Sequence, residues 1–200
     1  MAEKITIEIF RKKLPEELTK ALAEPDSRTD VGSGAALTAA TAAAYFLRAA
    51  ALTAEGTEGN ERLAYMLRNG EIVRGYMVHL IDEDVKSRGP LRKAIKEGDA
   101  RVIEAARQPA AAVANEIVNM MNQLLELLEE LSALCCDDAG RFAAASADLA
   151  MGAIRASMRY LLDQASRCSD ETYRYIVKRE NEITLEACRQ SYAKILEKVG

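Results

Sequence analysis

A long run of small and apolar residues, from Ala35 to Ala54, constrains this chain more than any other feature. It consists mainly of alanine and threonine, and Arg48 is its one charged residue. Alanine has the highest helix propensity, and its small side chain lets neighbouring helices approach closely. The run has the length of a membrane span, but its alanine, threonine and arginine content favours a packed helix. We therefore expect a helical protein that is not embedded in a membrane.

Two further segments have the periodicity of packed helices. Between 61 and 87, one series of mostly apolar residues recurs at alternating spacings of four and three. It consists of Met66, Gly70, Val73, Met77 and Leu80, and Asp84 is in phase with it. After Pro109 a heptad seam follows, made of Ile117, Met121, Leu124, Leu128 and Leu131. The 200 residues contain no linker rich in proline, glycine or serine. The sequence predicts one domain, 1–200, folded as an all-α, up-and-down bundle of long antiparallel helices.

Glycine, proline and acidic residues predict the boundaries in the first half. Ile5–Phe10 alternates as a strand would, but no partner strand is evident, so we expect most of this region to be helical, with Pro15 in a first turn. We expect a loop over Pro25–Gly34, in which Ser33 would be the N-cap of the next helix. Asn69-Gly70 is a possible break, and Gly89-Pro90 should end the helix that begins near Glu61.

The second half has its own boundary signals. Residues 91–107 predict a short charged helix, and Pro109 should open a long one. A turn is expected at 135–138, with Asp137 or Asp138 as N-cap of a helix over Ala139–Ser166. Ser169 or Asp170 should cap the last helix.

Charge and cysteine content exclude several functions. The net charge is −4, and no cluster of Lys and Arg suits nucleic acid. The four cysteines form no CxxC pair and there is one histidine, so we expect no metal site. The N-terminus, MAEKITIEIF, carries charges where a signal peptide needs an apolar core. We expect reduced thiols and a cytoplasmic protein.

Asp84 is the most informative polar residue. It falls in phase with an apolar stripe, where burial of a carboxylate is unfavourable unless it is paired or hydrogen-bonded. Burial raises the pKa of a carboxyl, which suits acid–base chemistry near neutrality. The alternative is that the helix ends here and Asp84 is solvated. Asp82 and Glu83 should point to other sides of the helix, into solvent.

Other candidates carry weaker signals. Gly32-Ser33-Gly34 precedes the alanine-rich helix, whose free amides would attract an anion or a carbonyl oxygen, although a simple loop that ends in an N-cap at Ser33 is the commoner explanation. Asp138 at a helix start is a candidate or an ordinary N-cap. Arg155 and Arg159 lie one turn apart and would hold an acidic ligand or face water. His79 and the Cys135-Cys136 pair are more typical of structural residues.

The order of these motifs resembles the formiminotetrahydrofolate cyclodeaminase and methenyltetrahydrofolate cyclohydrolase family over nearly the whole chain. Leu80-Ile81-Asp82-Glu83-Asp84 is similar to the family's LIDED segment, and Asp138-Ala139-Gly140 to its SDAG turn. Gln108-Pro109 stands where the family has Val-Pro, and Arg155 with the small residues after it resembles an alanine-rich RGA stretch.

The chain also departs from the family pattern. Of the family's PTPGGGS loop, only Gly32 and Ser33 fit. Ser87-Arg88 replaces Ala-Phe, and Tyr160 stands where an Asn is expected. These departures leave open a helical protein that has lost catalysis and binds a small molecule or serves as an accessory protein.

The resemblance implies a homodimer that acts on a tetrahydrofolate derivative, with no prosthetic group. The reaction would be methenyltetrahydrofolate hydrolysis or formiminotetrahydrofolate cyclodeamination. Asp84 would be the catalytic carboxylate, and Gly32, Ser33 and Gly34 would approach the pterin. Asp138 would also belong to the substrate site, and Arg155 and Arg159 would meet the folate glutamate.

Overall fold

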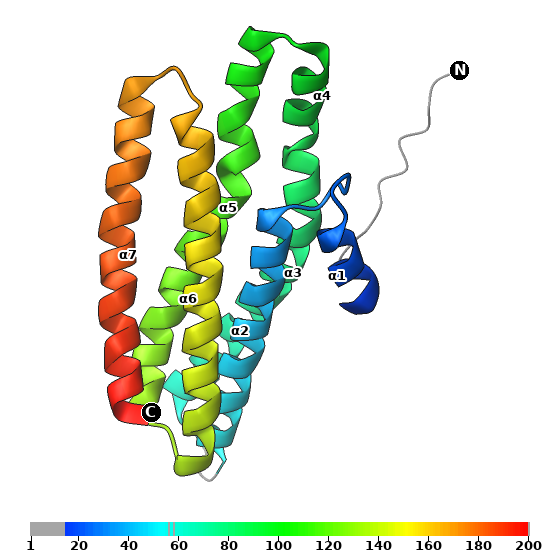
Figure 1. Ribbon diagram of the computed structural model, residues 1–200. Coiled ribbons are helices and arrows are strands. Elements are labelled where there is room, and N and C mark those ends of the chain that lie inside the picture. The colour runs from blue at the N-terminus through cyan, green and yellow to red at the C-terminus, as the bar shows by residue number, and fades with distance from the viewer. Residues whose placement is uncertain (1–14, 56, 58, 200) are drawn as a thin grey trace.

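The computed structural model describes residues 15–55, 57 and 59–199, so the expectation for Ile5–Phe10 lies outside the described residues. Within them the chain forms seven α-helices and no strand: α1 Pro15–Ala23, α2 Val31–Ala54, α3 Glu61–Ser87, α4 Gly89–Glu97, α5 Ala100–Ser132, α6 Asp137–Ser166 and α7 Glu171–Val199. The long helices run alternately down and up the bundle, and α4 continues α3 (Figure 1). The predicted all-α, up-and-down bundle is confirmed.

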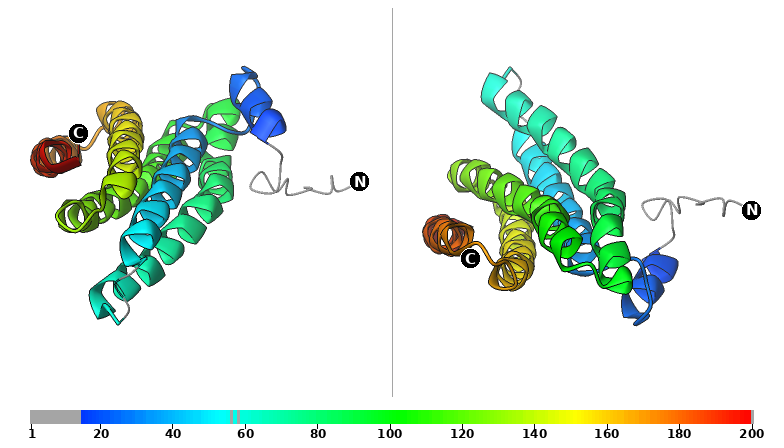
Figure 2. Two further views of the ribbon diagram at one scale, coloured as in Figure 1. Left: turned by 90° about the horizontal axis from the view of Figure 1, so that it is seen from below. Right: turned by 90° about the horizontal axis from the view of Figure 1, so that it is seen from above.

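Helix α2 lies in the middle of the bundle. Figure 2 shows it between α3 and α6, and it packs closely against both. Its alanines are the reason, since Ala36, Ala39 and Ala43 are fully buried and admit neighbouring backbones. The approach is close enough for the Ser146 hydroxyl of α6 to donate a hydrogen bond of 2.7 Å to the Ala42 carbonyl oxygen.

By length and mean hydropathy alone, α2 is also the one helix in the described ranges that would be able to cross a membrane. Half of that apolar stretch is buried inside the bundle, as in the core helix of a folded domain.

The two predicted apolar series both face the core. Every member of the α3 stripe is buried, Asp84 included. The seam of α5 is fully buried from Ile117 to Leu131. Helix α7 has the smallest buried fraction of the seven helices, because only Cys188 and Ile195 of its 29 residues are buried.

Several predicted boundaries are wrong. Pro109 lies inside α5, which begins nine residues earlier at Ala100 behind the N-cap Asp99. Gly98 ends α4 in the left-handed conformation, with φ 74°, so the turn lies before Asp99 rather than at Gln108. The end of α3, in contrast, is confirmed: the helix stops at Ser87, just before Gly89-Pro90, and a single non-helical residue, Arg88, separates it from α4. The N-cap of α6 is Cys136, which makes no side-chain cap, and Asp137 and Asp138 lie in the first turn.

Of two other boundary predictions, one is wrong and one is confirmed. Asn69-Gly70 does not break α3, which is continuous from Glu61 to Ser87. Asp170 does cap α7, because its carboxylate accepts a hydrogen bond of 3.0 Å from the Tyr173 amide.

Gly70 allows α3 to approach α2, and substitution there tests this packing. A Cβ at Gly70 would lie 2.8 Å from atoms of Phe46 and Leu47, and Phe46 is fully buried. We expect Gly70→Ala to lower the free energy of unfolding by about 1–3 kcal/mol, as overpacking does. Gly75→Ala on the same helix meets nothing within 4 Å and should raise it by about 0.5–1 kcal/mol. Urea denaturation of both variants measures the difference, and equal effects would contradict the packing argument.

Candidate functional site

Asp84 is buried where α3 passes the first turn of α2. Its side chain is 1% exposed. Carboxylate Oδ2 accepts two hydrogen bonds from Ser33, one from the backbone N–H at 2.9 Å and one from the hydroxyl at 2.7 Å. The Ser33 amide is one of the N–H groups that a helix start leaves without an intrahelical partner. Asp84 therefore caps α2 from a different helix. Its burial was predicted correctly from its phase in the α3 stripe.

The first turn of α2 is shaped to receive this carboxylate. The N-cap is Asp30, whose Oδ1 accepts a hydrogen bond of 2.7 Å from the Val31 amide. Gly32-Ser33-Gly34 thus forms the first turn of the helix and not a loop, and Ser33 is not the N-cap. A Cβ on Gly32 would lie 2.1 Å from Asp84 Oδ1, so only glycine leaves room for the carboxylate.

Arg88 links the two aspartates. Its Nη2 forms an ion pair with Asp30 Oδ2, and its Nη1 lies 3.9 Å from Asp84 Oδ2. The guanidinium carbon lies 5.6 Å from the centre of the Tyr160 ring, which comes from α6. Helices α2, α3 and α6 therefore each contribute side chains to one cluster. The cluster lies at the start of α2. In Figure 1, α6 and the α3–α4 segment extend beyond this point.

Burial dominates the acid–base properties of the cluster. Loss of solvent raises the pKa of Asp84 above its ordinary value, the bonds from Ser33 and the charge of Arg88 oppose this, and Asp30 adds to it. Asp84 therefore holds a proton at a higher pH than an exposed aspartate. Burial also raises the pKa of Tyr160, so its hydroxyl is protonated near neutrality.

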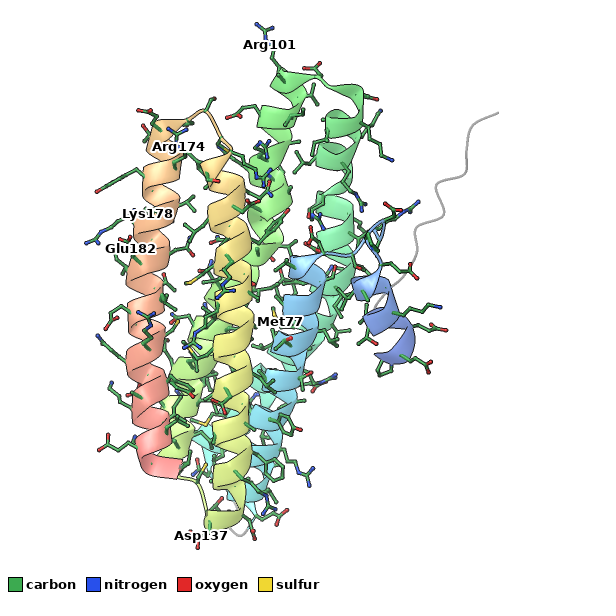
Figure 3. All side chains as sticks on the ribbon, in the orientation of Figure 1. Met77, Arg101, Asp137, Arg174, Lys178 and Glu182 are labelled. Atoms are coloured by element: carbon green, nitrogen blue, oxygen red, sulfur yellow. The ribbon has the colours of Figure 1, made fainter. Side chains whose placement is uncertain are left out.

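Asp138 is not part of this cluster. Its side chain is 81% exposed, and its carboxylate Oδ1 lies 3.7 Å from Arg141 Nη1. Figure 3 shows the adjacent Asp137 at the lower end of the bundle and Met77 near its middle. Asp84 lies two turns beyond Met77, away from Asp137, so the two predicted carboxylates are far apart along the bundle.

Arg155 and Arg159 lie on α6 but not on the side that faces Asp84. Both are exposed, whereas Tyr160 is buried beside Arg88. Successive helix residues are rotated by about 100°, so the two arginines point to other sides of α6 than Tyr160 does. Arg155 lies near α7, where its charge opposes the rise in the pKa of Tyr192. The structure brings Gly32, Ser33 and Asp84 together, with Gly34 one residue beyond, and leaves these two arginines outside.

Asp82 differs from the expectation that it would be solvated. It is buried, because this end of α3 is covered on several sides and Leu80, Ile81, Asp82 and Asp84 are all inaccessible. Asp82 is therefore not a suitable exposed control for Asp84.

Sequence reasoning missed Asp30, Arg88 and Tyr160 as members of the site. A signal was present for two of them, since Arg88 and Tyr160 are positions at which the chain departs from the family pattern. Their proximity depends on how α3 and α6 are placed on the two sides of α2, which no local pattern reports.

Cysteine and metal chemistry have no evident place in this cluster. All four cysteines are free, and burial raises the pKa of the Cys188 thiol to about 11. In the ranges that the structure describes, no group of three His, Cys, Asp or Glu side chains is placed to hold a metal ion.

Comparison with known proteins relates the chain to one family and to solved structures. A family described as Formiminotransferase-cyclodeaminase matches residues 15–182. The crystal structure of formiminotetrahydrofolate cyclodeaminase from Thermotoga maritima superposes with a TM-score of 0.87 at 19% sequence identity. This similarity covers 94% of the present chain and 96% of the Thermotoga chain. A search of curated protein sequences gives no match.

The contact between Gly32 and Asp84 can be tested with a pair of glycine variants. In Gly32→Ala the new methyl group would displace the Asp84 carboxylate from both Ser33 donors, so we expect a loss of about 1–3 kcal/mol in unfolding free energy. Gly34→Ala meets only Leu22 atoms, the nearer at 3.7 Å, and should be neutral or stabilising. Urea denaturation compares them. A neutral Gly32→Ala variant would show that the carboxylate is not confined.

The raised pKa of Asp84 predicts a specific pH dependence of stability. Because the folded state holds this proton more tightly than the unfolded state, the contribution is fully present below the unfolded pKa and is lost as pH rises through the folded pKa. Asp84→Asn removes this loss. The melting temperature of the variant minus that of the wild type should therefore increase as pH rises above the ordinary pKa of an aspartate, about 3.9, and level off above the raised pKa. Calorimetry at several pH values measures it, and a difference that decreases would indicate a stabilising charge.

Proposed function

Because this chain belongs to the formiminotransferase-cyclodeaminase family, we propose that it acts on a one-carbon derivative of tetrahydrofolate, at the site around Asp84. The reaction would be methenyltetrahydrofolate hydrolysis or formiminotetrahydrofolate cyclodeamination. The observation that carries the proposal is a buried carboxyl with a raised pKa, held against the start of α2 by Ser33. Such a group can accept and return a proton near neutrality.

Both reactions need that property. In the hydrolysis, water adds to the carbon between N5 and N10, the carbon–N5 bond breaks, and N5 gains a proton. A carboxylate that takes the proton from water and gives it to N5 serves both steps, and one further proton is released to solvent. In the cyclodeamination, N10 adds to the formimino carbon and loses its proton, and the former imino nitrogen leaves as ammonia once it is protonated. Asp84 would supply the proton to the leaving nitrogen.

A second candidate is a small-molecule-binding or accessory protein without catalysis. The observation that favours it is Arg88, whose Nη1 lies 3.9 Å from Asp84 Oδ2 and which also pairs with Asp30. A guanidinium at this place repels the cationic methenyl group and occupies the approach to Asp84. In that case Asp84 is a structural cap of α2.

The proposed homodimer and cytoplasmic location rest on the family and on the sequence. Small residues are frequent on α2 and α6 and could suggest an interface between copies, but these two helices pack against each other within one chain and so give the dimer no support. Exposed apolar residues on α7, among them Tyr175 and Ile183, are a more suitable surface for a second copy.

Asp84→Asn decides between enzyme and binding protein. If the chain turns over folate, the variant should keep the fold and lower kcat/KM by about 10²–10⁴, the usual share of acid–base catalysis. The decrease in methenyltetrahydrofolate absorbance measures hydrolysis, and titration with 5-formyltetrahydrofolate measures binding. Glu71→Gln is the matched control, because Glu71 lies on the same helix but is exposed and pairs with Arg74.

The outcomes separate the candidates. Equal turnover by Asp84→Asn and wild type would exclude Asp84 as the catalytic group. Folate binding without turnover by the wild type would support a binding protein, and neither binding nor turnover would exclude folate as the ligand.

A further inference from the structure

Four buried polar groups around Arg88 and Tyr160 have no hydrogen-bond partner within the described part of the chain. They are Nε and Nη1 of Arg88 and the hydroxyls of Tyr160 and Ser157. Tyr160 is 8% exposed and Ser157 is fully buried. Buried polar groups in folded proteins are nearly always paired, so this cluster is an exception that needs a cause.

These groups belong to one place in the fold. Ser157 and Tyr160 lie three residues apart on α6 and therefore face the same side of the helix. The guanidinium carbon of Arg88 lies 5.6 Å from the Tyr160 ring centre. All four groups can donate a hydrogen bond, and the two nitrogen atoms of Arg88 can only donate. The two hydroxyls can also accept, for example from Arg88, but a group with several acceptor oxygens would satisfy all four donors.

The charge around Arg88 favours an anion. The Arg92 Nη1 atom donates a hydrogen bond of 3.0 Å to the Arg28 carbonyl oxygen, which brings a second guanidinium to this end of the protein. The pKa of Arg92 is lowered by burial and by the nearby charges of Arg88 and Arg28. Asp30 and Asp84 offset part of this positive charge. Three arginines against two aspartates leave a positive excess, which is larger whenever Asp84 is protonated.

We propose that Arg88, Tyr160 and Ser157 form a binding site for a small oxyanion, the carboxylate or phosphate group of a ligand, beside Asp84. A carboxylate or phosphate offers only acceptor oxygens and a negative charge, and arginine and hydroxyl donors are its usual partners. The site does not depend on folate turnover. The carboxylates of a folate lie at the far end of the molecule from its one-carbon group, so this anion belongs to a second ligand or to a different small molecule.

Calorimetric titration of the full chain tests the proposal. Inorganic phosphate and acetate are the two probes, at low salt, with chloride at equal ionic strength as the reference. We expect the wild type to bind at least one probe. Arg88→Met should weaken that binding about tenfold or more, and Tyr160→Phe about three- to tenfold, because each removes donors to a charged group. Phosphate binding tighter than acetate indicates a phosphate ligand, and the reverse indicates a carboxylate.

Matched controls separate this site from general surface charge. Arg189→Met and Tyr175→Phe alter exposed residues of α7 and should leave the affinity unchanged. Tyr160→Phe removes one oxygen atom and keeps the ring, so it remains informative if Arg88→Met fails to fold. The proposal is overturned if neither probe binds more tightly than chloride, or if the affinity is unchanged in Tyr160→Phe or in a folded Arg88→Met.

Discussion

The close approach of α2 to both α3 and α6 is the constraint on which the rest of the bundle depends. Alanine side chains on α2 and glycine at position 70 of α3 let three helices meet with little space between their backbones. Larger residues would separate α3 from α6, and the cluster of Asp84, Arg88 and Tyr160 spans those two helices. The alanines that favour helix formation in α2 thus also set how close α3 and α6 can lie to each other at the site.

Periodicity predicted burial well because it shows which face of a helix is apolar, and many residues along the helix contribute to that pattern. The α3 stripe and the α5 seam were both assigned to the core, and the placement of Asp84 followed from the same argument. Boundaries were predicted less well, because proline and glycine have more than one use. Pro109 is accommodated inside α5, and Gly70 serves helix packing and not chain reversal.

The members of the site differ in how much a sequence can say about them. Asp84 could be found because a charged residue in an apolar phase is a local anomaly. Asp138 also had a local argument, but a helix start says nothing about which end of the bundle it occupies. Arg88, between α3 and α4, and Tyr160, in α6, carry no local sign of a role beyond their departure from the family pattern. They acquire a role only from each other's proximity, and that depends on how α3 and α6 are placed on the two sides of α2.

The fit of Asp84 against Gly32 has a consequence for how this sequence can diverge. Since a side chain at position 32 would collide with the carboxylate, any replacement of the glycine requires a smaller partner at position 84 or a shift of α2. Loss of the aspartate, in contrast, would free position 32 to accept alanine or serine. The two positions should therefore be inherited as a pair. In distant members of the family, this pair is a better marker of a preserved site than the number of glycines in the segment before α2.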